Sequence, residues 1–410
     1  MSESSNDSPS DQDAAPPIPL TAPESGFRGP LTDVADLAEL AAALGTGAGP
    51  IALDAERASG FRYSARAYLV QLRRDDVGTV LLDPIALGSA VADLAEPLHT
   101  GEWILHAAKE DLPCLAELGL RPDRLFDTEV AARLAGLPKV GLGALVEQLL
   151  GRGLAKGHGA EDWSSRPLPE SWLVYAALDV ELLDALRVQL TALLREQGKW
   201  EWAQQEFAAL AAAGPPAPRA EPWRRVSGLS QLKDRRGLAV ARELWQARDQ
   251  LAAERDIAPH RVLPDAAIVA AASRPIGSAD ELAKVSVFGG RSQRRQLRHW
   301  FDAVQRGRRL PDGQLPVRRP ETDAAPPPGR WERRDPDAAA RLAVLRDGLD
   351  ALAERWSMPV ENLVTPSLAR QVLWDRVDPT AVPDRLTAGG ARPWQVELVT
   401  PVLRDALATR

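Results

Sequence analysis

The sequence contains little of several residue types that define particular classes of protein. Its 410 residues include one cysteine, Cys114, which excludes a disulfide-stabilised scaffold and a cysteine-rich zinc site. A lone thiol is typical of a reducing compartment, so we expect a cytoplasmic protein. No apolar run reaches the roughly 18 residues of a membrane-spanning helix, and we expect no membrane partner. The acidic N-terminus MSESSNDSPSDQDAAPP lacks the basic and apolar segments of a signal peptide.

The chain also has fewer basic than acidic residues. The chain carries 50 lysines and arginines against 57 acids, a net charge of −7. Taken alone, this balance argues against a nucleic-acid partner. Apolar residues make up 45% of the chain and charged residues 26%, an ordinary globular mixture whose length predicts two or three domains.

Three stretches of low complexity divide the chain. Residues 1–30 are rich in serine, aspartate and proline and lack periodicity, which predicts a disordered tail. The proline-rich stretches 211–222 and 310–334 block both helix and strand, so we interpret them as linkers. They leave a first block (31–210), a second block (223–309) and a third block (335–410).

The first block alternates apolar runs with helical periodicity, which predicts an α/β fold with a mixed sheet. Strands are expected at 50–56, 67–73, 79–83 and 103–107, and a further strand or a turn is expected at 124–128. Helices are expected at 33–45, 87–100, 109–119, 128–135 and 141–151, with one long helix at 169–197. The second and third blocks show helical periodicity alone. LAAERDIAPHRVL aligns with LAERWSMPVENLV one hundred residues later, which indicates a duplicated all-α domain.

Five residues of the first block form a pattern that suits metal-dependent phosphodiester chemistry. Asp54 and Glu56 share one face of a strand, and Asp111 begins a helix after another strand. Tyr175 and Asp179 share one face of the last helix. Each element alone has an ordinary structural explanation. Together, four carboxylates suit two Mg²⁺ or Mn²⁺ ions that stabilise the attacking and leaving oxygens, and a tyrosine can orient the attacking water.

Three motifs carry a family resemblance. ALDAE, HAAKEDL and YAALDV resemble the exonuclease motifs of the DEDD superfamily of 3′–5′ exonucleases, and the flanking EDWSSRPLPESW resembles ribonuclease D. The resemblance implies a ribonuclease H-like domain that binds two divalent metal ions through four acids and releases nucleoside 5′-monophosphates. It also implies that Asp54 bridges the metals, Glu56 and Asp179 hold the metal that activates water, Asp111 supports the leaving-group metal, and Tyr175 orients the nucleophile. Val174 lies where the histidine subclass has its base, so the chain resembles the tyrosine subclass.

The second block resembles the helicase-and-ribonuclease-D C-terminal (HRDC) domain, and the third resembles a divergent second copy. Residues 223–310 carry 18 basic and 9 acidic residues, so the negative total conceals a basic domain. Within it, Arg291, Arg294, Arg295 and Arg298 are spaced to form one stripe on a helix, which predicts contact with RNA phosphates. The equivalent positions of the third block are Ala391, Trp394, Gln395 and Leu398. We therefore expect that block to pack against another domain or to guide RNA by shape.

Other reactive side chains have simpler interpretations. We interpret His106, at the end of an apolar strand, as a buried or supporting histidine rather than a metal ligand. His158 lies in a glycine-rich stretch and is interpreted as part of an ordinary loop. Cys114 follows Asp111 among apolar residues and is interpreted as a buried thiol.

The sequence thus predicts a metal-dependent 3′–5′ exoribonuclease that processes the 3′ ends of structured RNA such as tRNA precursors, with no stable protein partner. A 3′–5′ exodeoxyribonuclease remains an alternative, because contacts to the ribose 2′-hydroxyl cannot be identified from sequence. A non-catalytic RNA-binding scaffold is a second alternative, although all four acids and the tyrosine are present. No G-x-x-x-x-G-K-[ST] loop occurs, which disfavours a helicase.

Overall fold

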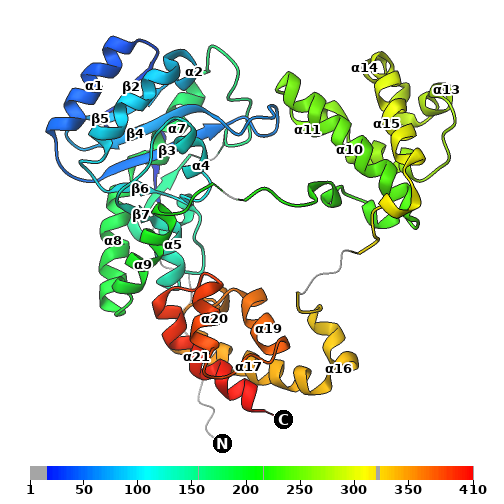
Figure 1. Ribbon diagram of the computed structural model, residues 1–410. Helices are drawn as coiled ribbons and strands as arrows, with labels where there is room; N and C mark the ends of the chain where they lie inside the picture. Colours follow the sequence, from blue (N-terminus) through cyan, green and yellow to red (C-terminus); the bar gives the residue numbers. More distant parts are fainter. Residues whose placement is uncertain (1–15, 156, 216, 320–323, 410) are drawn as a thin grey trace, which may run out of the picture.

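The computed structural model describes residues 16–155, 157–215, 217–319 and 324–409. The first block is an α/β unit, and the two helical blocks lie on different sides of it (Figure 1). Helix α11 of the second block is the part of that block nearest to the α/β unit, whereas α13 and α14 lie at its far end. None of the described helices is both long and apolar enough to cross a membrane.

A six-stranded mixed sheet organises the first block. Its order is β2 (Phe27–Leu31), β5 (Gly78–Leu82), β4 (Ala67–Arg74), β3 (Ile51–Arg57), β6 (Trp103–Leu105) and β7 (Leu125–Asp127). Strand β4 pairs antiparallel with β3 and β5, and the other neighbours are parallel. The central strands are buried on both faces because helices cover them, and so they appear in the sequence as continuous apolar runs.

Helices pack on both faces of this sheet and extend below it. They are α1 (Val34–Thr46), α2 (Pro84–Leu87), α3 (Ala95–Leu98), α4 (Leu112–Glu117), α5 (Thr128–Leu134), α6 (Leu142–Leu150), α7 (Glu170–Glu181), α8 (Leu183–Glu196) and α9 (Trp200–Ala211). A 3₁₀ segment, Gly88–Leu94, joins α2 to α3. The predicted strands and the α/β fold class are therefore confirmed.

The second and third blocks are entirely helical in their described parts. The second contains α10 (Arg235–Arg255), α11 (Pro259–Val262), α12 (Asp265–Ala272), α13 (Ala279–Ala283), α14 (Arg291–Arg295) and α15 (Leu297–Arg309). The third contains α16 (Trp331–Arg334), α17 (Pro336–Arg355), α18 (Val360–Leu363), α19 (Pro366–Trp374), α20 (Val382–Ala388) and α21 (Pro393–Ala408). In both blocks a long helix is followed by a four-residue helix and then a third helix, in keeping with the predicted repeat.

The prediction of a disordered tail over 1–30 is wrong for its second half. Strand β1 (Ile18–Leu20) pairs with β8 (Arg152–Leu154), and β2 pairs with β5 at the edge of the main sheet. These strands are fixed by partners far away in the sequence, which local periodicity cannot reveal. Residues 1–15 lie outside the described residues.

The prediction of one helix over 169–197 is also wrong. Helix α7 ends at Glu181, Leu182 adopts a non-helical conformation (φ −112°, ψ 9°), and α8 begins at Leu183. The two helices bury most of their apolar side chains in different clusters. Leu173 and Ala177 of α7 pack with residues of β4, whereas the leucines of α8 belong to the core that the first block shares with the third.

The predicted linker 310–334 extends too far toward the third block. Trp331 of α16 is fully buried, and its indole N–H donates to the Pro326 carbonyl at 2.7 Å. The Ala325 amide donates to the side chain of Gln371 at 2.7 Å. The third block therefore begins before residue 335, because a buried tryptophan offsets the local cost of the prolines.

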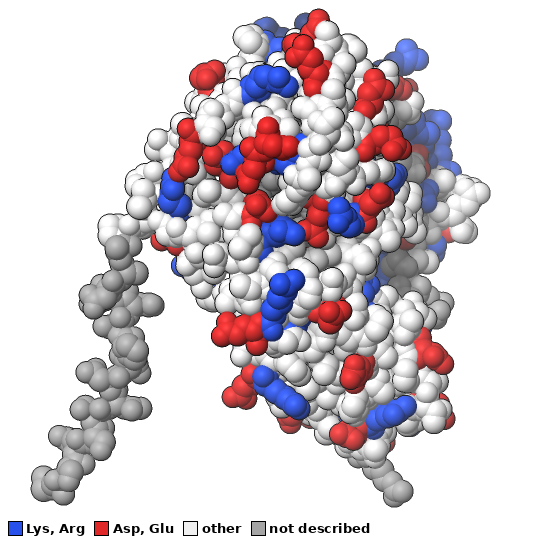
Figure 2. All heavy atoms as spheres, turned by 90° about the vertical axis from the view of Figure 1, so that its left-hand side faces the viewer, with Lys and Arg blue, Asp and Glu red and all other residues white. Residues whose placement is uncertain are grey.

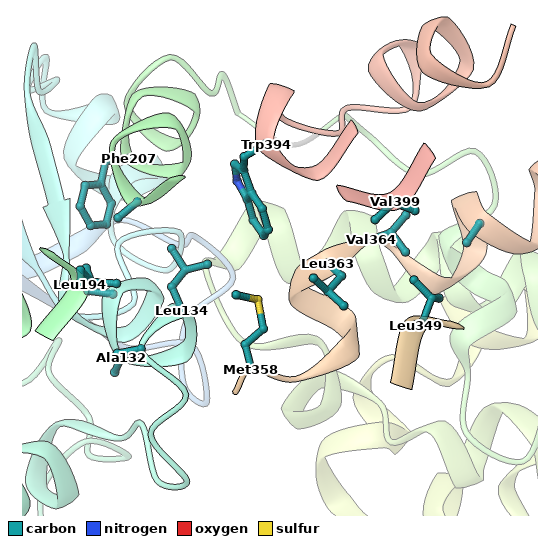
Figure 3. Packing of buried hydrophobic residues seen from close by; sticks show 14 of the residues in the cluster. Ala132, Leu134, Leu194, Phe207, Leu349, Met358, Leu363, Val364, Trp394 and Val399 are labelled. Carbon is teal, nitrogen blue, oxygen red and sulfur yellow. The ribbon is translucent and has the colours of Figure 1, made fainter. Parts of the chain in front are cut away.

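The third block shares a hydrophobic core with the first. In Figure 3, Met358 and Trp394 of the third block lie near Leu134 of the first block, and Phe207 of the first block lies farther along the same cluster. The Trp394 ring stacks on Trp202 with centroids 4.9 Å apart, and its indole N–H donates to Glu206 at 3.0 Å. The prediction that this block packs against another domain is confirmed.

Candidate functional site

Strand β3 and helix α7 bring three of the predicted acids together. Asp54 and Glu56 lie on the same side of β3, and α7 crosses this strand. Carboxylate oxygens of Asp54, Glu56 and Asp179 all lie within 4.8 Å of one another. This grouping follows from two local periods, i to i+2 on the strand and i to i+4 on the helix.

Asp111 approaches the same group from another element. It immediately precedes α4, is 5% exposed, and its carboxylate interacts with that of Asp54. The turn that leads to it is held by Asp127, whose carboxylate accepts from the amides of Ala107 and Ala108 at 3.3 and 2.8 Å. Asp127 also caps α5 through the amide of Glu129, so one buried side chain fixes both the turn and the next helix.

The clustered carboxylates raise one another's pKa. Burial, followed by repulsion from Asp54, Asp179 and Asp111, raises the pKa of Glu56 to about 10. Burial and then the charge of Asp54 raise the pKa of Asp111 to about 9. Burial also raises the pKa of Asp54 and of Asp179. Carboxylates in this arrangement require additional positive charge to be ionised together.

Two polar neighbours that sequence reasoning missed touch these acids. The Gln71 side-chain amide on β4 donates to Asp54 at 3.1 Å, across the antiparallel pair in which Gln71 lies opposite Asp54. The Arg57 guanidinium lies 3.3 Å from Glu110 and 3.5 Å from Asp111. The strand register places Gln71, and a prediction of strand pairing would have identified it.

Tyr175 lies one helical turn before Asp179. Burial, followed by the charges of Asp179 and Glu56, raises the pKa of its hydroxyl far above the ordinary value. The hydroxyl is therefore protonated near neutral pH and can donate a hydrogen bond, but it cannot act as a base. The His158 ring meets Tyr175 edge-on at a centroid distance of 5.8 Å.

A cleft of about 320 Å³ opens at the end of β3. Its walls are formed by three segments, namely 55–60, Glu110 and 159–161. Glu56 and Arg57 are among the lining residues, so the cleft gives a ligand access to the carboxylate group.

Arg166, in the segment before α7, makes five hydrogen bonds. It pairs with both oxygens of Asp83 at 2.6 and 2.9 Å and donates to the carbonyls of Tyr68, Trp163 and Ser165 at 2.7–2.8 Å. This network holds the segment that precedes α7 against the sheet. Arg166 belongs to the motif EDWSSRPLP, but its partner lies 83 residues earlier, so the sequence could not pair them.

The remaining predictions concerning histidines and cysteine agree with the structure. His106 is mostly buried and contacts the Thr128 hydroxyl at 2.9 Å, and burial lowers its pKa to about 4. Burial and the charge of Asp111 raise the pKa of the Cys114 thiol to about 12, so this cysteine is a poor nucleophile. His158 lies in the loop before Trp163, as expected.

The predicted arginine stripe on one helix is wrong in its geometry. Arg291, Arg294 and Arg295 lie on α14, which ends at Gln296 (φ −106°, ψ 8°), and Arg298 lies on α15. Trp300 is fully buried and its indole N–H donates to Gln293 at 2.9 Å, which ties the two helices together across the break. All four arginine side chains are exposed, so they form a basic surface on two helices rather than one stripe.

Charge is distributed differently over the first block. Figure 2 views this block and the third block from the side away from the second, and acidic and basic side chains alternate there without a continuous basic area. The excess of basic residues instead belongs to the second block, where residues 223–310 carry 18 basic and 9 acidic side chains.

Three family models match successive parts of the chain. Residues 30–195 match the model described as 3′–5′ exonuclease, 237–304 match the HRDC domain, and 324–407 match the 3′ to 5′ exonuclease C-terminal domain. The third block is thus matched by a description of its own, distinct from that of the second.

Similar proteins agree with these matches. Ribonuclease D of Gluconacetobacter diazotrophicus is 33% identical over 274 residues, which cover 65% of this chain and 68% of that protein. A crystal structure of a protein from Bifidobacterium adolescentis superimposes with a TM-score of 0.85 at 37% identity, covering 95% of this chain and 99% of that one.

Escherichia coli RNase D, described as an exoribonuclease involved in structured RNA processing, superimposes with a TM-score of 0.66 at 26% identity. The match covers 92% of this chain and 97% of that one. Taken with the carboxylates on β3, before α4 and on α7, these findings show that the chain belongs to the ribonuclease D family and is a 3′–5′ exoribonuclease.

Proposed function

We propose that Asp54, Glu56, Asp111 and Asp179, with Tyr175, form the catalytic site, and that the enzyme trims the 3′ ends of structured RNA such as tRNA precursors. The observation that carries the site is the meeting of four buried or half-buried carboxylates whose pKa values are all raised. Such a group is costly in a folded protein unless cations compensate it.

The residues fit two divalent metal ions. Every donor in the group is a carboxylate oxygen, which suits Mg²⁺ or Mn²⁺ better than a softer metal. Asp54 would contact both ions, Glu56 and Asp179 would hold one, and Asp111 would hold the other. When bound, the ions supply the positive charge that stabilises the attacking and leaving oxygens of the phosphodiester.

The side chains of the chain itself position the reactants. The protonated hydroxyl of Tyr175 donates to the attacking water and orients it toward phosphorus. Gln71 holds the Asp54 carboxylate from β4, and Asp127 holds the turn before Asp111. Attack by water breaks the bond between the last phosphorus and the 3′-oxygen of the preceding nucleotide. The terminal nucleotide then leaves as a nucleoside 5′-monophosphate, and the shortened RNA keeps a 3′-hydroxyl.

The second block supplies affinity for the substrate in this proposal. Arg291, Arg294, Arg295 and Arg298 are exposed and suit the phosphates of RNA, which they would contact without reading sequence. We propose an exonuclease domain at 31–210, an HRDC domain at 223–309 and a divergent HRDC-like domain formed by the third block. A cytoplasmic location and the absence of a stable protein partner are part of the same proposal.

The test is hydrolysis of 3′-structured RNA by the Asp54→Asn variant. Replacing one carboxylate by a neutral amide of the same shape should lower kcat by roughly 100-fold or more while leaving RNA binding unchanged. The readout is release of 5′-monophosphates from end-labelled RNA and DNA in Mg²⁺, in Mn²⁺ and with chelator. Faster hydrolysis of DNA than of RNA would support the exodeoxyribonuclease instead.

The matched control is Glu117→Gln. Glu117 is an exposed acid at the end of α4, the helix that Asp111 precedes, and it is not among the residues that line the cleft. Its variant should keep kcat within about twofold of the wild type, as expected for an exposed side chain. Full activity of Asp54→Asn would refute the site.

A further inference from the structure

The loop between β3 and β4, residues 58–66, forms part of the candidate active-site cleft. It follows directly from the strand that carries Asp54 and Glu56. Its residues Ser59 and Gly60 line the cleft together with Glu56. The position of this loop therefore sets one wall of the cleft.

The second block holds this loop through a corner formed by residues 256–261, which runs from the end of α10 into α11. The Ala258 amide donates to the Phe61 carbonyl at 2.9 Å, and Arg261 Nε donates to the Gly60 carbonyl at 2.7 Å. The Arg261 guanidinium also stacks on the Phe61 ring, 4.1 Å from its centroid. Two carbonyls and one aromatic ring of the loop are thus fixed from outside the first block.

Asp256 extends the same contact toward β4. Its carboxylate accepts from the Ser64 amide at 2.8 Å and from the Tyr68 hydroxyl at 3.4 Å. The residue ends α10 in a left-handed conformation (φ 47°, ψ 49°), which directs its side chain away from the helix end. Residues other than glycine are uncommon in this conformation, because their Cβ atom carries a steric cost there.

The other side of the loop contacts the segment that leads into α7. Arg62 Nε donates to the Ser164 hydroxyl at 2.8 Å, and Ala58 is fully buried in a cluster with Trp163 and Leu173. Helix α7 carries Tyr175 and Asp179. The loop thus touches both elements of the candidate catalytic site, and the second block touches the loop.

We propose that the corner 256–261 is a positioning element of the active site, with Asp256 and Arg261 as its positioning residues. In this view the second block contributes to turnover through the 58–66 loop, in addition to any contribution to RNA binding through its arginines. The effect on turnover rests on the catalytic site proposed above, whereas the effect on the order of the loop does not.

Two variants of the full-length protein, Asp256→Gly and Arg261→Ala, test this proposal. Glycine adopts the left-handed conformation freely, so Asp256→Gly removes the carboxylate without a steric cost to α10. Steady-state hydrolysis of a triribonucleotide gives kcat and KM, and amide hydrogen exchange reports the order of residues 58–66. We expect kcat to fall about tenfold with KM within about twofold, and loop exchange to accelerate about tenfold, as for loss of one charge-assisted hydrogen bond.

Three further variants separate the positioning role from other effects. Asp256→Asn tolerates the same backbone conformation and keeps an acceptor for Ser64, so it should remain close to wild type. Arg255→Ala changes an exposed neighbour on the same helix end and should also have no effect. Lys284→Ala changes an exposed lysine just after α13 that is not part of the proposed RNA-binding surface, and it should leave the kinetics on the triribonucleotide unchanged.

The possible outcomes are distinct. Unchanged kcat in both Asp256→Gly and Arg261→Ala overturns the positioning role, even if their thermal stability falls. Unchanged exchange of the loop amides overturns it as well. If Asp54→Asn hydrolyses the triribonucleotide as fast as the wild type, the proposed catalytic site fails, and hydrogen exchange alone then decides whether the corner orders the loop.

Discussion

The two helical blocks have a similar order of helices but are attached to the first block in different ways. The third block buries Met358 and Trp394 in a continuous apolar core with it. The second block has a separate core and meets the first block at a small polar corner. The same order of helices thus forms an integral part of the structure in the third block and a separate, basic domain in the second.

The surfaces of the two blocks also differ, because corresponding positions are exposed and basic in the second block but mostly packed in the third. The four exposed arginines of α14 and α15 correspond in the third block to Ala391, Trp394, Gln395 and Leu398. Trp394 is buried there, and the Gln395 side chain donates to the Asn362 carbonyl at 2.7 Å. Residues at positions that remain free for a ligand in the second block are used for packing in the third.

The largest effect is expected at the apolar interface. Trp394→Ala should lower the free energy of unfolding by about 3–5 kcal/mol, because it removes a buried indole and leaves a cavity. The measurement is denaturant unfolding of the full chain followed by tryptophan fluorescence. Arg225→Ala, on an exposed arginine far from this interface in the sequence, is the control and should change stability by less than about 0.5 kcal/mol.

If the contrast between the blocks is correct, Trp394→Ala should destabilise the first and third blocks in one transition and leave that of the second block unchanged. Glycine at position 136 gives a second variant of the same interface. A Cβ there would overlap the carbonyl oxygen of Ser357, and the backbone φ is +76°. Gly136→Ala should therefore act in the same direction as Trp394→Ala, and separate melting of the third block would contradict the shared core.

An intermediate effect is expected from metal and pH. In the metal-free protein the pKa of Glu56 is raised to about 10 and that of Asp111 to about 9, so their protonated forms favour the folded state. This contribution is complete below the ordinary carboxyl pKa of about 4 and is lost as pH rises toward those values. Metal ions bind the ionised acids, so stabilisation by Mg²⁺ should grow with pH.

The measurement is the unfolding temperature with Mg²⁺ or chelator between about pH 6 and about pH 8.5. At a fixed metal concentration of about 100 times the Kd that holds at about pH 8.5, stabilisation of the first and third blocks should reach about 2.7 kcal/mol at that pH and be smaller at lower pH. The transition of the second block should not move. A shift of equal size at all pH values would contradict the assignment of the raised carboxylates to the metal site.

The smallest effect is expected in RNA affinity. Replacing Arg291, Arg294, Arg295 and Arg298 with alanine should weaken binding by about tenfold at moderate salt and reduce the salt slope by up to about 3–4 units. Arg346→Ala with Arg355→Ala in the third block should change Kd by less than about twofold. Binding isotherms over a range of salt concentrations make the comparison, and equal effects in the two blocks would remove the distinction between them.

The sequence predicts the fold class and the carboxylate group well because both follow local periods. The spacing of Asp54 and Glu56 on a strand and of Tyr175 and Asp179 on a helix decides which side chains share a face. Buried strands in a covered sheet are continuous apolar runs, so β3 to β7 could be identified. The order of the strands in the sheet was not predicted.

Features that depend on distant partners could not be predicted. Strands β1 and β2 exist because β8 and β5 pair with them, and Gln71 reaches Asp54 because of the register between β3 and β4. The pairing of Arg166 with Asp83 and the docking of Asp256 on Ser64 are of the same kind. The break at Gln296 divides a pattern that looks continuous in sequence, because spacing reports a helix face but not where a helix ends.

The non-helical residue Leu182 has a mechanical consequence. Asp179 lies on α7, which ends two residues later, whereas the third block contacts α9, beyond the break. If α7 and α8 formed one continuous helix, a tilt of its distal end would move Asp179 directly. Because the helix is interrupted at Leu182, bending at this residue can take up strain from the tryptophan interface before it reaches the carboxylates.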